Sequence, residues 1–326
     1  MQNSLKKTLL DILVCPRDRQ PLVIENDQLV CSHGHHYPVV SGIPVMLLDD
    51  VDVTHNAITD SIAQAKQNTF EITQNRKGVH PFVQKVIAAT NGNLYVPLID
   101  KLNAYPIPKI RLPKGSGQLL LDIGCNWGRW SISAAQAGYK AVGIDPSLEA
   151  ILAAREVAEE LGYTESVEFL VADARYLPFN DNVFDVVFSY SVLQHFSKEN
   201  VHVTLAQISN ILKPQGLCLI QMPNIYGVRN SYNNRKPEMH DERNIFRVRY
   251  WSIEELKEVF SRHIGESKLS VDGFFGLGIQ FSDISILPLH YKAVVFSSEI
   301  LRQLSLLFPP MLHLADSVYI ASTKNA

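Results

Sequence analysis

The sequence predicts an α/β protein with a doubly wound, mostly parallel, seven-stranded sheet, preceded by a small β-rich module. Three observations predict this fold. From residue 118 onward, short apolar runs alternate with longer segments of helical periodicity. The first run, Leu119–Ile123, is mainly apolar, as expected for a parallel strand that is buried on both faces. By contrast, residues 1–50 consist of short segments separated by prolines and glycines, which is typical of a small β-rich unit.

Helices are expected between the seven strands. The clearest is Leu148–Leu161, which is rich in alanine and leucine and is followed by Gly162 as a stop signal. The insertion 274–314, before the last strand, is markedly apolar. It predicts core packing, a dimer surface or a pocket for a lipid-linked substrate. The predicted strands are 119–123, 140–144, 167–171, 183–189, 217–222, 269–274 and 317–322, and the other helices are 127–137, 200–212 and 251–263.

These elements divide the chain into three parts. Residues 1–50 form the β-rich module, 51–116 a linker and lid, and 117–326 the α/β domain. The lid is expected to contain Asn91–Tyr95 and Tyr105, because these residues lie between the two folded parts.

The composition is that of an ordinary globular protein, with 46% hydrophobic and 19% charged residues among 326. Lysine and arginine number 30 against 33 acidic residues, which disfavours a protein that holds nucleic acid by charge alone. Four cysteines indicate a reducing compartment rather than a disulfide framework, so the expected location is the cytoplasm. Asp11 interrupts the first apolar stretch, which favours an amphipathic helix over a signal peptide. No run is long enough to predict a transmembrane segment.

Acidic residues end three successive strands of the predicted sheet. Asp122 leads into a loop with Gly124 and Gly128, where glycine allows a tight turn and a close approach to a ligand. Asp145 ends the second strand, where a carboxylate can accept hydrogen bonds from both ribose hydroxyls. Asp173 ends the third, which places an acceptor beside an adenine amino group. The sequence therefore predicts a nucleotide-like cofactor at this edge of the sheet.

The loop does not fit the dinucleotide fingerprint, which requires glycine at the positions of Asn126 and Arg129. The succession LLDIGC, GIDPS, ADA, FDVV and LKPQG instead resembles class I S-adenosylmethionine-dependent methyltransferases over residues 118–222. The resemblance implies a Rossmann-like sheet with S-adenosylmethionine as cofactor.

By this resemblance Asp122 and Gly124 face the methionine part, Asp145 holds the ribose, and Asp173 with Ala174 contacts the adenine. These families usually have glycine where Asn126 stands. Asparagine adopts left-handed backbone more readily than most residues, so we expect the loop to keep its shape. The predicted cofactor residues are Asp122, Gly124, Asn126, Gly128, Asp145, Asp173, Ala174 and Ser189.

Four residues of the N-terminal module have the spacing of a zinc site, Cys15-x2-Asp18-x12-Cys31-x3-His35. Aspartate replaces the cysteine that normally completes the first pair, and zinc accepts carboxylate oxygen. The flanks LLDILVCP and HHYPVVSGIPVML resemble zinc-ribbon-like modules that precede or partner methyltransferases, including ribosomal RNA guanine methyltransferases. A ribbon that has lost its metal is the alternative. His33 and His36 are expected at the surface.

His195 follows the fourth strand, close to where the transferred methyl group is expected. It is either a catalytic general base or a hydrogen-bonded residue that fixes this loop. Residues 224–251 follow the fifth strand and interleave arginines with tyrosines. This pattern is typical of a loop that recognises an anionic or sugar-like substrate, or of a solvated charged surface.

The sequence therefore predicts S-adenosylmethionine-dependent O- or N-methylation of a small or sugar-like metabolite, because the chain lacks a strong basic bias. The first alternative is an RNA (guanine) methyltransferase, favoured by the zinc-ribbon spacing. The second is a non-catalytic cofactor-binding partner protein, for which Asn126 is the support. The expected partner is a small-molecule substrate, and a homodimer is kept as an option.

Overall fold

The computed structural model describes residues 5–53, 56–67, 79–90, 102–233, 248–276 and 281–326. The chain separates into two compact units. The first comprises Met1–Tyr105 and Ile110–Phe184, and the second Pro106–Lys109 and Asp185–Ala326. The N-terminal module and the first half of the α/β fold share the first unit. The boundaries after residues 50 and 116 stay predictions.

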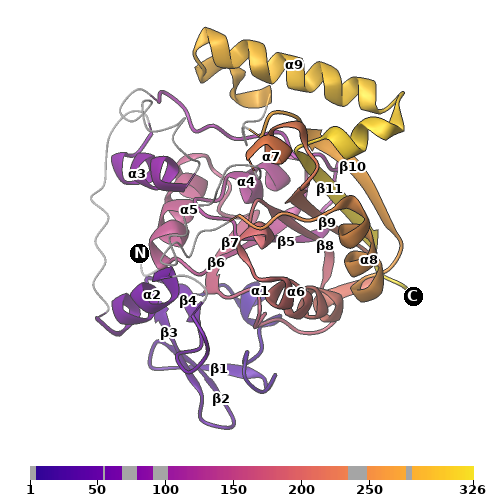
Figure 1. The fold of residues 1–326 in the computed structure, drawn as a ribbon. Coiled ribbons are helices and arrows are strands. Elements are labelled where there is room, and N and C mark those ends of the chain that lie inside the picture. The colour runs from indigo at the N-terminus through magenta and orange to yellow at the C-terminus, as the bar shows by residue number, and fades with distance from the viewer. Residues whose placement is uncertain (1–4, 54–55, 68–78, 91–101, 234–247, 277–280) are drawn as a thin grey trace. The chain divides into compact units, whose positions relative to one another are not determined.

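The N-terminal module is an antiparallel meander that follows the short helix α1 (Lys7–Leu10) (Figure 1). Two of its tight turns use left-handed backbone. Asn26 and Asp27 have φ values of 48° and 58°, and Ser41 has a φ of 52° before Gly42. Such two-residue turns match the twist of antiparallel strands. The strands are β1 (Leu22–Glu25), β2 (Gln28–Cys31), β3 (His36–Val40) and β4 (Ile43–Met46).

Strand β4 joins the module to the larger sheet. It pairs in parallel with β7 (Val167–Ala172), with Val45 opposite Val171 and Met46 opposite Ala172. All four residues of β4 are buried, as in an internal strand. The sheet of the first unit has the order β1-β2-β3-β4-β7-β6-β5. The predicted β-rich module is therefore present, and it extends the same sheet.

Parallel strands form the rest of this sheet. β5 (Leu119–Ile123) pairs with β6 (Lys140–Asp145), and β6 pairs with β7. Their residues are almost all buried, as strands covered on both faces require. Helix α4 (Arg129–Gln136) follows β5, and α5 (Leu148–Glu160) follows β6 and is capped by the side chain of Ser147. Two other helices contact elements of this unit: α2 (Asn56–Gln67) and α3 (Pro81–Thr90).

In the second unit the described strands have the order β8-β9-β11-β10. β11 is antiparallel to both neighbours, with Tyr319 opposite Gln221 of β9 and Ser270 of β10. A capping box of Ser252 and Glu255 starts α8. The elements are β8 (Phe184–Tyr190), η2 (Leu193–His195), α6 (Lys198–Ile211), β9 (Leu212–Pro223), α7 (Val228–Asn233), α8 (Ile253–His263), β10 (Ser267–Gly273), η3 (Phe281–Ile286), α9 (Leu289–Ser305), η4 (Pro309–Leu314) and β11 (Ser317–Thr323).

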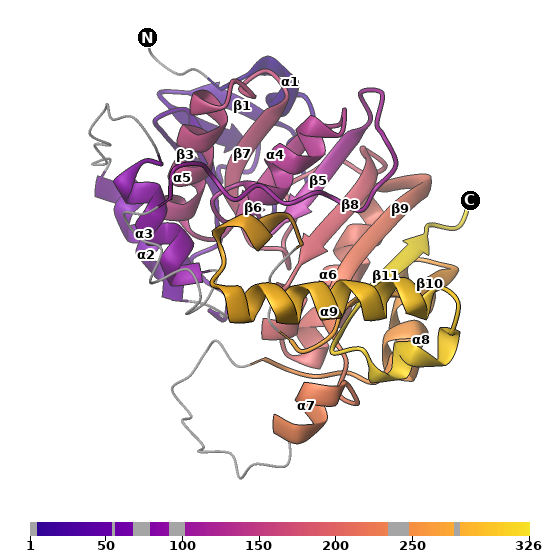
Figure 2. The ribbon, with the colours of Figure 1, turned by 90° about the horizontal axis from the view of Figure 1, so that it is seen from above.

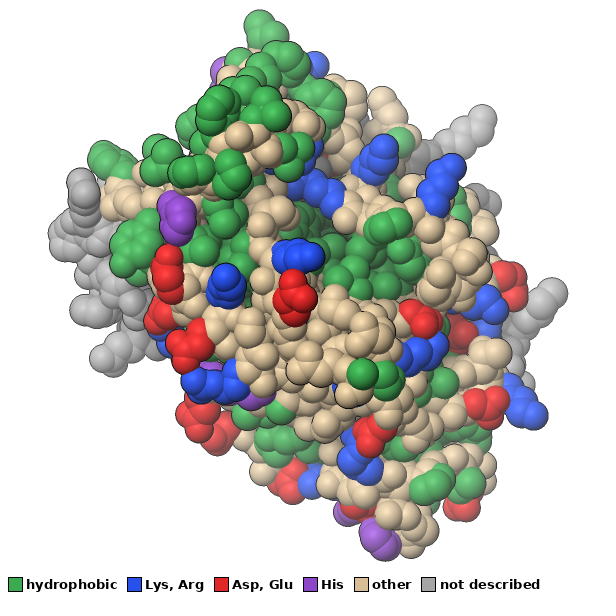
Figure 3. Space-filling model, turned by 90° about the vertical axis from the view of Figure 1, so that its right-hand side faces the viewer, with side chains coloured by type: hydrophobic (Ala, Val, Ile, Leu, Met, Phe, Trp, Pro, Cys, Tyr) green, Lys and Arg blue, Asp and Glu red, His purple; other side chains and the backbone are tan. Residues whose placement is uncertain are grey.

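Helix α9 lies near β10 (Figure 2) and contacts it. Its outer face carries exposed apolar side chains. Val295 is the one buried residue in the helix. Hydrophobic side chains gather at the end of the molecule where α9 lies (Figure 3). Core packing, expected for 274–314, is therefore wrong for α9, and the dimer surface stays a prediction. The exposed apolar residues are Leu289, Phe296, Ile300 and Leu304, then Leu306, Leu307 and Phe308.

Within the residues that the structure describes, no helix combines the length and the apolarity needed to cross a membrane.

Candidate functional site

The glycine-containing loop after β5 is held against β6 by its backbone. The N–H groups of Gly124 and Cys125 both donate to the carbonyl of Ile144, at 2.8 and 2.9 Å. Asn126 has a φ of 50°, the left-handed backbone that asparagine tolerates. Its Oδ1 accepts a hydrogen bond from the N–H of Trp127 at 2.8 Å, which stabilises this conformation. The departure from glycine at this position is therefore compatible with the loop.

Gly128 allows close packing at the start of α4. Its φ is 81°, and a Cβ there would lie 3.0 Å from both Ala154 and Phe169. A side chain would therefore strain the backbone and collide with α5 and β7. This packing accounts for the glycine, and its cofactor contact stays a prediction.

Asp122 and Asp145 are buried carboxyls at the ends of neighbouring strands. Burial raises the pKa of Asp122 to about 7, although the Ser131 hydroxyl donates to it at 2.6 Å, and the charge of Asp145 raises it further. Burial raises the pKa of Asp145 to about 6, against N–H bonds from Ser147 at 2.9 Å and Asn126 at 3.1 Å. Because a nearby positive charge restores the ionised form of a carboxyl, this pair favours a cationic ligand.

Asp173 follows β7 and forms a buried ion pair with Arg175. Nη2 of Arg175 donates to Oδ2 at 2.6 Å, and the two side chains are 5% and 7% exposed. Ala174 between them is also buried. Sequence reasoning missed Arg175. The available signal was an arginine two residues after an aspartate expected to be buried, since a buried carboxylate requires a partner.

The two remaining predicted residues belong to the second unit. Ser189 is fully buried in β8. His195 ends η2, and its Nε2 lies 3.2 Å from the side-chain nitrogen of Gln194. Arg249 donates its N–H to the carbonyl of Gln194 at 2.7 Å and Nη1 to the carbonyl of His195 at 2.5 Å. This loop is thus hydrogen-bonded to residue 249. Both roles considered for His195, general base and loop fixing, stay predictions.

The four predicted metal ligands come together in the module. The ligand atoms of Cys15, Asp18, Cys31 and His35 all lie within 4.8 Å of one another. Nδ1 of His35 is 3.4 Å from each sulfur and 3.1 Å from Oδ2 of Asp18. Tetrahedral zinc, with bonds of about 2.0–2.3 Å, places neighbouring ligand atoms about 3.3–3.8 Å apart. The donor set and its spacing therefore fit a zinc ion.

Neighbouring side chains orient this cluster. Tyr37 is buried, and its hydroxyl lies 3.2 Å from Sγ of Cys15. His33 is exposed, as expected, but its Nδ1 lies 2.7 Å from Oδ2 of Asp18. His36 is exposed. Outer contacts of this kind fix the orientation of metal ligands.

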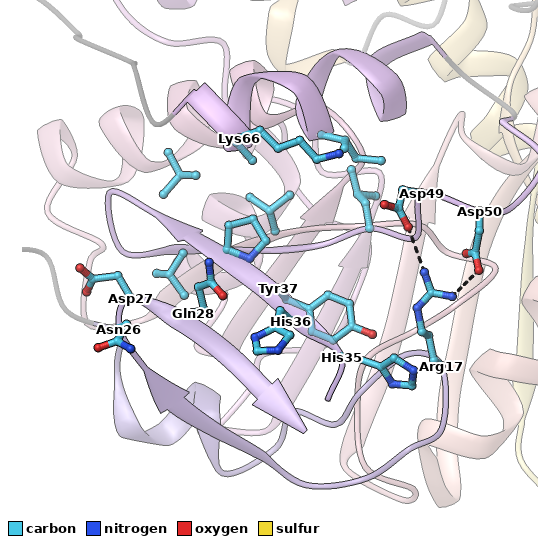
Figure 4. A pocket seen from close by; sticks show the side chains of 17 residues that line it. Arg17, Asn26, Asp27, Gln28, His35, His36, Tyr37, Asp49, Asp50 and Lys66 are labelled. Atoms are coloured by element: carbon cyan, nitrogen blue, oxygen red, sulfur yellow. Dashed lines mark hydrogen bonds and ion pairs between the residues drawn. The ribbon is translucent and has the colours of Figure 1, made fainter. Parts of the chain in front are cut away.

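A cavity of about 710 Å³ lies between α2 and the strands of the module (Figure 4). Arg17 lines it and binds Asp49 at 3.1 Å and Asp50 at 2.6 Å. His35 of the metal cluster and Lys66 of α2 also line it. None of the predicted cofactor residues lines this cavity, so it is distinct from the site at the ends of β5, β6 and β7.

Parts of the predicted substrate segment, 224–251, are described. Arg229 donates Nη1 to the carbonyls of residues 275 and 276, at 2.9 and 3.1 Å. Tyr226 and Tyr232 are exposed. The charged residues between 234 and 247, Arg235 and Arg243 among them, lie outside the described residues.

The predicted lid is also partly described. Asn91–Tyr95 lie outside the described residues. The Tyr105 hydroxyl donates to Oε2 of Glu160 at 2.5 Å, and its ring lies 6.3 Å from that of Trp127 in the cofactor loop. Tyr105 is therefore beside the loop, as a lid residue would be.

Two parts of this chain match families of known proteins. Residues 120–216 match the family described as Methyltransferase domain, and residues 6–42 match the family described as Trm112p-like protein. The first match includes the three aspartates, and the second includes the four predicted metal ligands. Residues 120–216 thus match a methyltransferase domain, the kind of domain that the sequence predicts.

Curated relatives match over limited lengths. The 27-O-demethylrifamycin SV methyltransferase of Amycolatopsis mediterranei is 37% identical over 106 residues, 32% of this chain and 38% of the relative. The tRNA U34 carboxymethyltransferase of Desulfotalea psychrophila is 32% identical over 117 residues, 36% of each protein. The chain therefore spans a little over a third of these relatives. A solved complex of the Haloferax volcanii Trm112 methyltransferase activator has a TM-score of 0.44 and 21% identity, covering 66% of this chain and 86% of that one.

Proposed function

We propose that this protein transfers the methyl group of S-adenosylmethionine to an oxygen or nitrogen of a small or sugar-like metabolite. One observation carries the proposal. Asp122 and Asp145 lie in the last residues of β5 and β6, and Asp173 directly follows β7, so all three lie at the carboxyl ends of adjacent parallel strands inside the matched domain. Doubly wound sheets bind ligands at that edge.

Each aspartate suits one part of the cofactor. Asp122, a buried carboxyl with a raised pKa, ionises most readily beside a cationic amino group. Asp145 accepts one backbone N–H on each oxygen, and each oxygen keeps a lone pair for a ribose hydroxyl. Asp173, held by Arg175, offers an acceptor to the adenine amino group. The bound cofactor supplies an electrophilic methyl group, and the chain positions the acceptor against it.

A transfer assay with methyl-labelled S-adenosylmethionine tests the proposal. The substrates are fractionated small metabolites and, separately, total RNA. Label in a small-molecule fraction, greatly reduced in Asp145→Asn, supports the proposed function. Label in RNA alone overturns the choice of acceptor. Absence of both transfer and cofactor binding overturns the function.

Methylation of RNA is the second candidate. The Trm112p-like match over residues 6–42 and the tRNA-modifying relative favour it. The net charge of −3 opposes it, because RNA binding draws heavily on phosphate contacts. Tight binding to bulk RNA that weakens steeply as salt rises would favour the RNA substrate. A non-catalytic partner protein is the third candidate, and methyl transfer by the purified chain would exclude it.

The module is proposed to hold one structural zinc ion on Cys15, Asp18, Cys31 and His35. Four protein ligands leave no open position, which is typical of structural rather than catalytic zinc. Zinc here would tie the segment 15–18 to the β2–β3 turn. It would thereby stabilise a module too small for a large apolar core.

The finer architecture is also a proposal. Three strands, β7-β6-β5, and four strands, β8-β9-β11-β10, supply the number that a seven-stranded sheet requires. The boundaries after residues 50 and 116 are proposed as functional divisions into module, lid and catalytic domain. The four cysteines are free, which supports a cytoplasmic location. The exposed face of α9 supports a homodimer.

A further inference from the structure

The segment that carries the predicted adenine contacts is held along its length by the N-terminal module. This adenine segment comprises residues 171–181. Its first two residues pair with β4. Further along, the N–H of Val14 donates to the carbonyl of Pro178, and the N–H of Asn180 donates to the carbonyl of Ile12, each at 2.9 Å. These contacts are made by backbone atoms on both sides, so they hold the path of the segment.

Side chains add to this attachment. Arg19 of the module donates Nη2 to the carbonyl of Phe179 at 2.8 Å and to Oδ1 of Asp181 at 2.6 Å. Every one of these contacts lies within the first unit. The module thus forms hydrogen bonds with the adenine segment both at its start and at its end.

Arg175, in the middle of the segment, connects Asp173 to Asp52, which lies just beyond the module in the chain that leaves β4. Its Nη2 donates to Oδ2 of Asp173 at 2.6 Å and to the backbone carbonyl of Asp52 at 2.7 Å. Its Nε lies 3.2 and 3.1 Å from the two carboxylate oxygens. A guanidinium is planar and its donors are fixed, so the position of the Asp52 carbonyl restricts the orientation of the Asp173 carboxylate.

We propose that Arg175 is a positioning residue for adenine recognition, and that through it the N-terminal module contributes to cofactor affinity. The inference rests on the proposed function, because it takes Asp173 as the acceptor for the adenine amino group. Asp52 lies just beyond the module, and the path of the chain there is set by β4 before it. A module that folds correctly therefore sets Asp173 in the orientation that the amino group requires.

The competing explanation is that Arg175 only neutralises a buried charge. Its loss would then weaken every ligand of the site equally. A pair of ligands separates the two explanations. S-adenosylhomocysteine carries the adenine amino group, and S-inosylhomocysteine carries a carbonyl in its place. The ratio of their dissociation constants measures recognition of that group alone.

The test is calorimetric titration of the full chain with both ligands. The wild type is expected to prefer S-adenosylhomocysteine by about tenfold or more, the worth of one hydrogen bond to a charged group. Arg175→Ala is expected to reduce this preference below about threefold. Arg175→Lys keeps the positive charge but lacks the planar guanidinium. Its preference for S-adenosylhomocysteine is expected to lie between those of the wild type and Arg175→Ala.

The matched control is Arg155→Ala. Arg155 also donates to a module carbonyl, that of Ser41, but makes no contact with Asp173 in the described structure. This variant is expected to keep the wild-type preference. Arg19→Ala tests the module's part, and it is expected to weaken S-adenosylhomocysteine binding by about threefold or more.

A wild-type preference retained in Arg175→Ala overturns the positioning role. If that variant does not fold, judged by circular dichroism, an undiminished preference in Arg175→Lys overturns it instead. Unchanged affinity in Arg19→Ala overturns the contribution of the module. A wild type that binds neither ligand contradicts the proposed function itself, which is a different result from either of these.

Discussion

The backbone N–H of Asn126 donates a hydrogen bond to Oδ2 of Asp145 at 3.1 Å, and so joins the loop after β5 to the end of β6. Asn126 makes this contact with left-handed backbone, at a φ of 50°. The residue that departs from the usual glycine therefore also orients the carboxyl proposed to hold the ribose. Backbone conformation at residue 126 and the position of Asp145 are linked.

Two substitutions at Asn126 test this link. Asn126→Gly is expected to keep S-adenosylmethionine affinity within about threefold, because glycine adopts positive φ without strain. Asn126→Val is expected to weaken binding by about tenfold, since holding a β-branched residue at this φ costs about 1–3 kcal/mol. Calorimetric titration measures both. Equal affinities of the two variants would contradict the link.

The raised pKa values of Asp122 and Asp145 predict how stability depends on pH. These values, about 7 and about 6, lie above the value of about 3.9 in the unfolded chain. Between these limits the native state binds more protons than the unfolded state, so this contribution to stability is lost as pH rises from about 4 to about 7. Asp122→Asn removes one of the two carboxyls whose protonation differs between the native and the unfolded state. It is expected to be more stable than the wild type by over about 1 kcal/mol near pH 8, but not near pH 4.

Urea unfolding without cofactor, at several pH values, measures this effect. Asp60→Asn, at an exposed position of α2, is the matched control, and it is expected to follow the wild type. If the difference between Asp122→Asn and the wild type does not change with pH, the assignment of a buried, protonated carboxyl is wrong.

Zinc content tests the metal cluster. The wild type is expected to hold one zinc ion per chain. Cys31→Ala is expected to lose the ion and about 5 °C or more of thermal stability, because one of the four ligands is gone. His36→Ala, which alters an exposed histidine outside the cluster, is expected to retain zinc. Metal analysis of the purified proteins decides the matter, and a wild type without stoichiometric zinc rules the site out.

The exposed face of α9 predicts a homodimer. Phe296, Ile300 and Leu304 succeed each other at four-residue spacing on one side of the helix. Phe296→Glu places a charge in this surface and is expected to convert a dimer to a monomer in light scattering. Val203→Glu alters an exposed apolar residue of α6 and is expected to leave the dimer intact. A monomeric wild type would show that this face does not join two copies.

The sequence predicts the α/β elements closely because their signals are local. Lys140–Ile144 is expected as a strand and β6 is Lys140–Asp145, while α5 ends one residue before its expected end. Glycine residues and the ends of apolar runs mark where these helices and strands begin and end, and these signals do not depend on the tertiary fold. The shared position of the three aspartates at one edge of the sheet is equally predictable, since the carboxyl ends of parallel strands lie at the same edge.

Other features have no local signal. The bond between Arg175 and the carbonyl of Asp52 joins residues 123 positions apart, and the pairing of β4 with β7 is similarly distant. The apolar composition of α9 does not reveal whether its face is buried or exposed, because either placement gives the same pattern. Such contacts depend on how the elements pack.

The most direct test of the account is calorimetric titration of the purified chain with S-adenosylmethionine and, separately, with NAD. We expect one site for S-adenosylmethionine, a loss of affinity of about tenfold or more in Asp145→Asn, and no detectable binding of NAD. Binding of NAD without binding of S-adenosylmethionine would contradict the account.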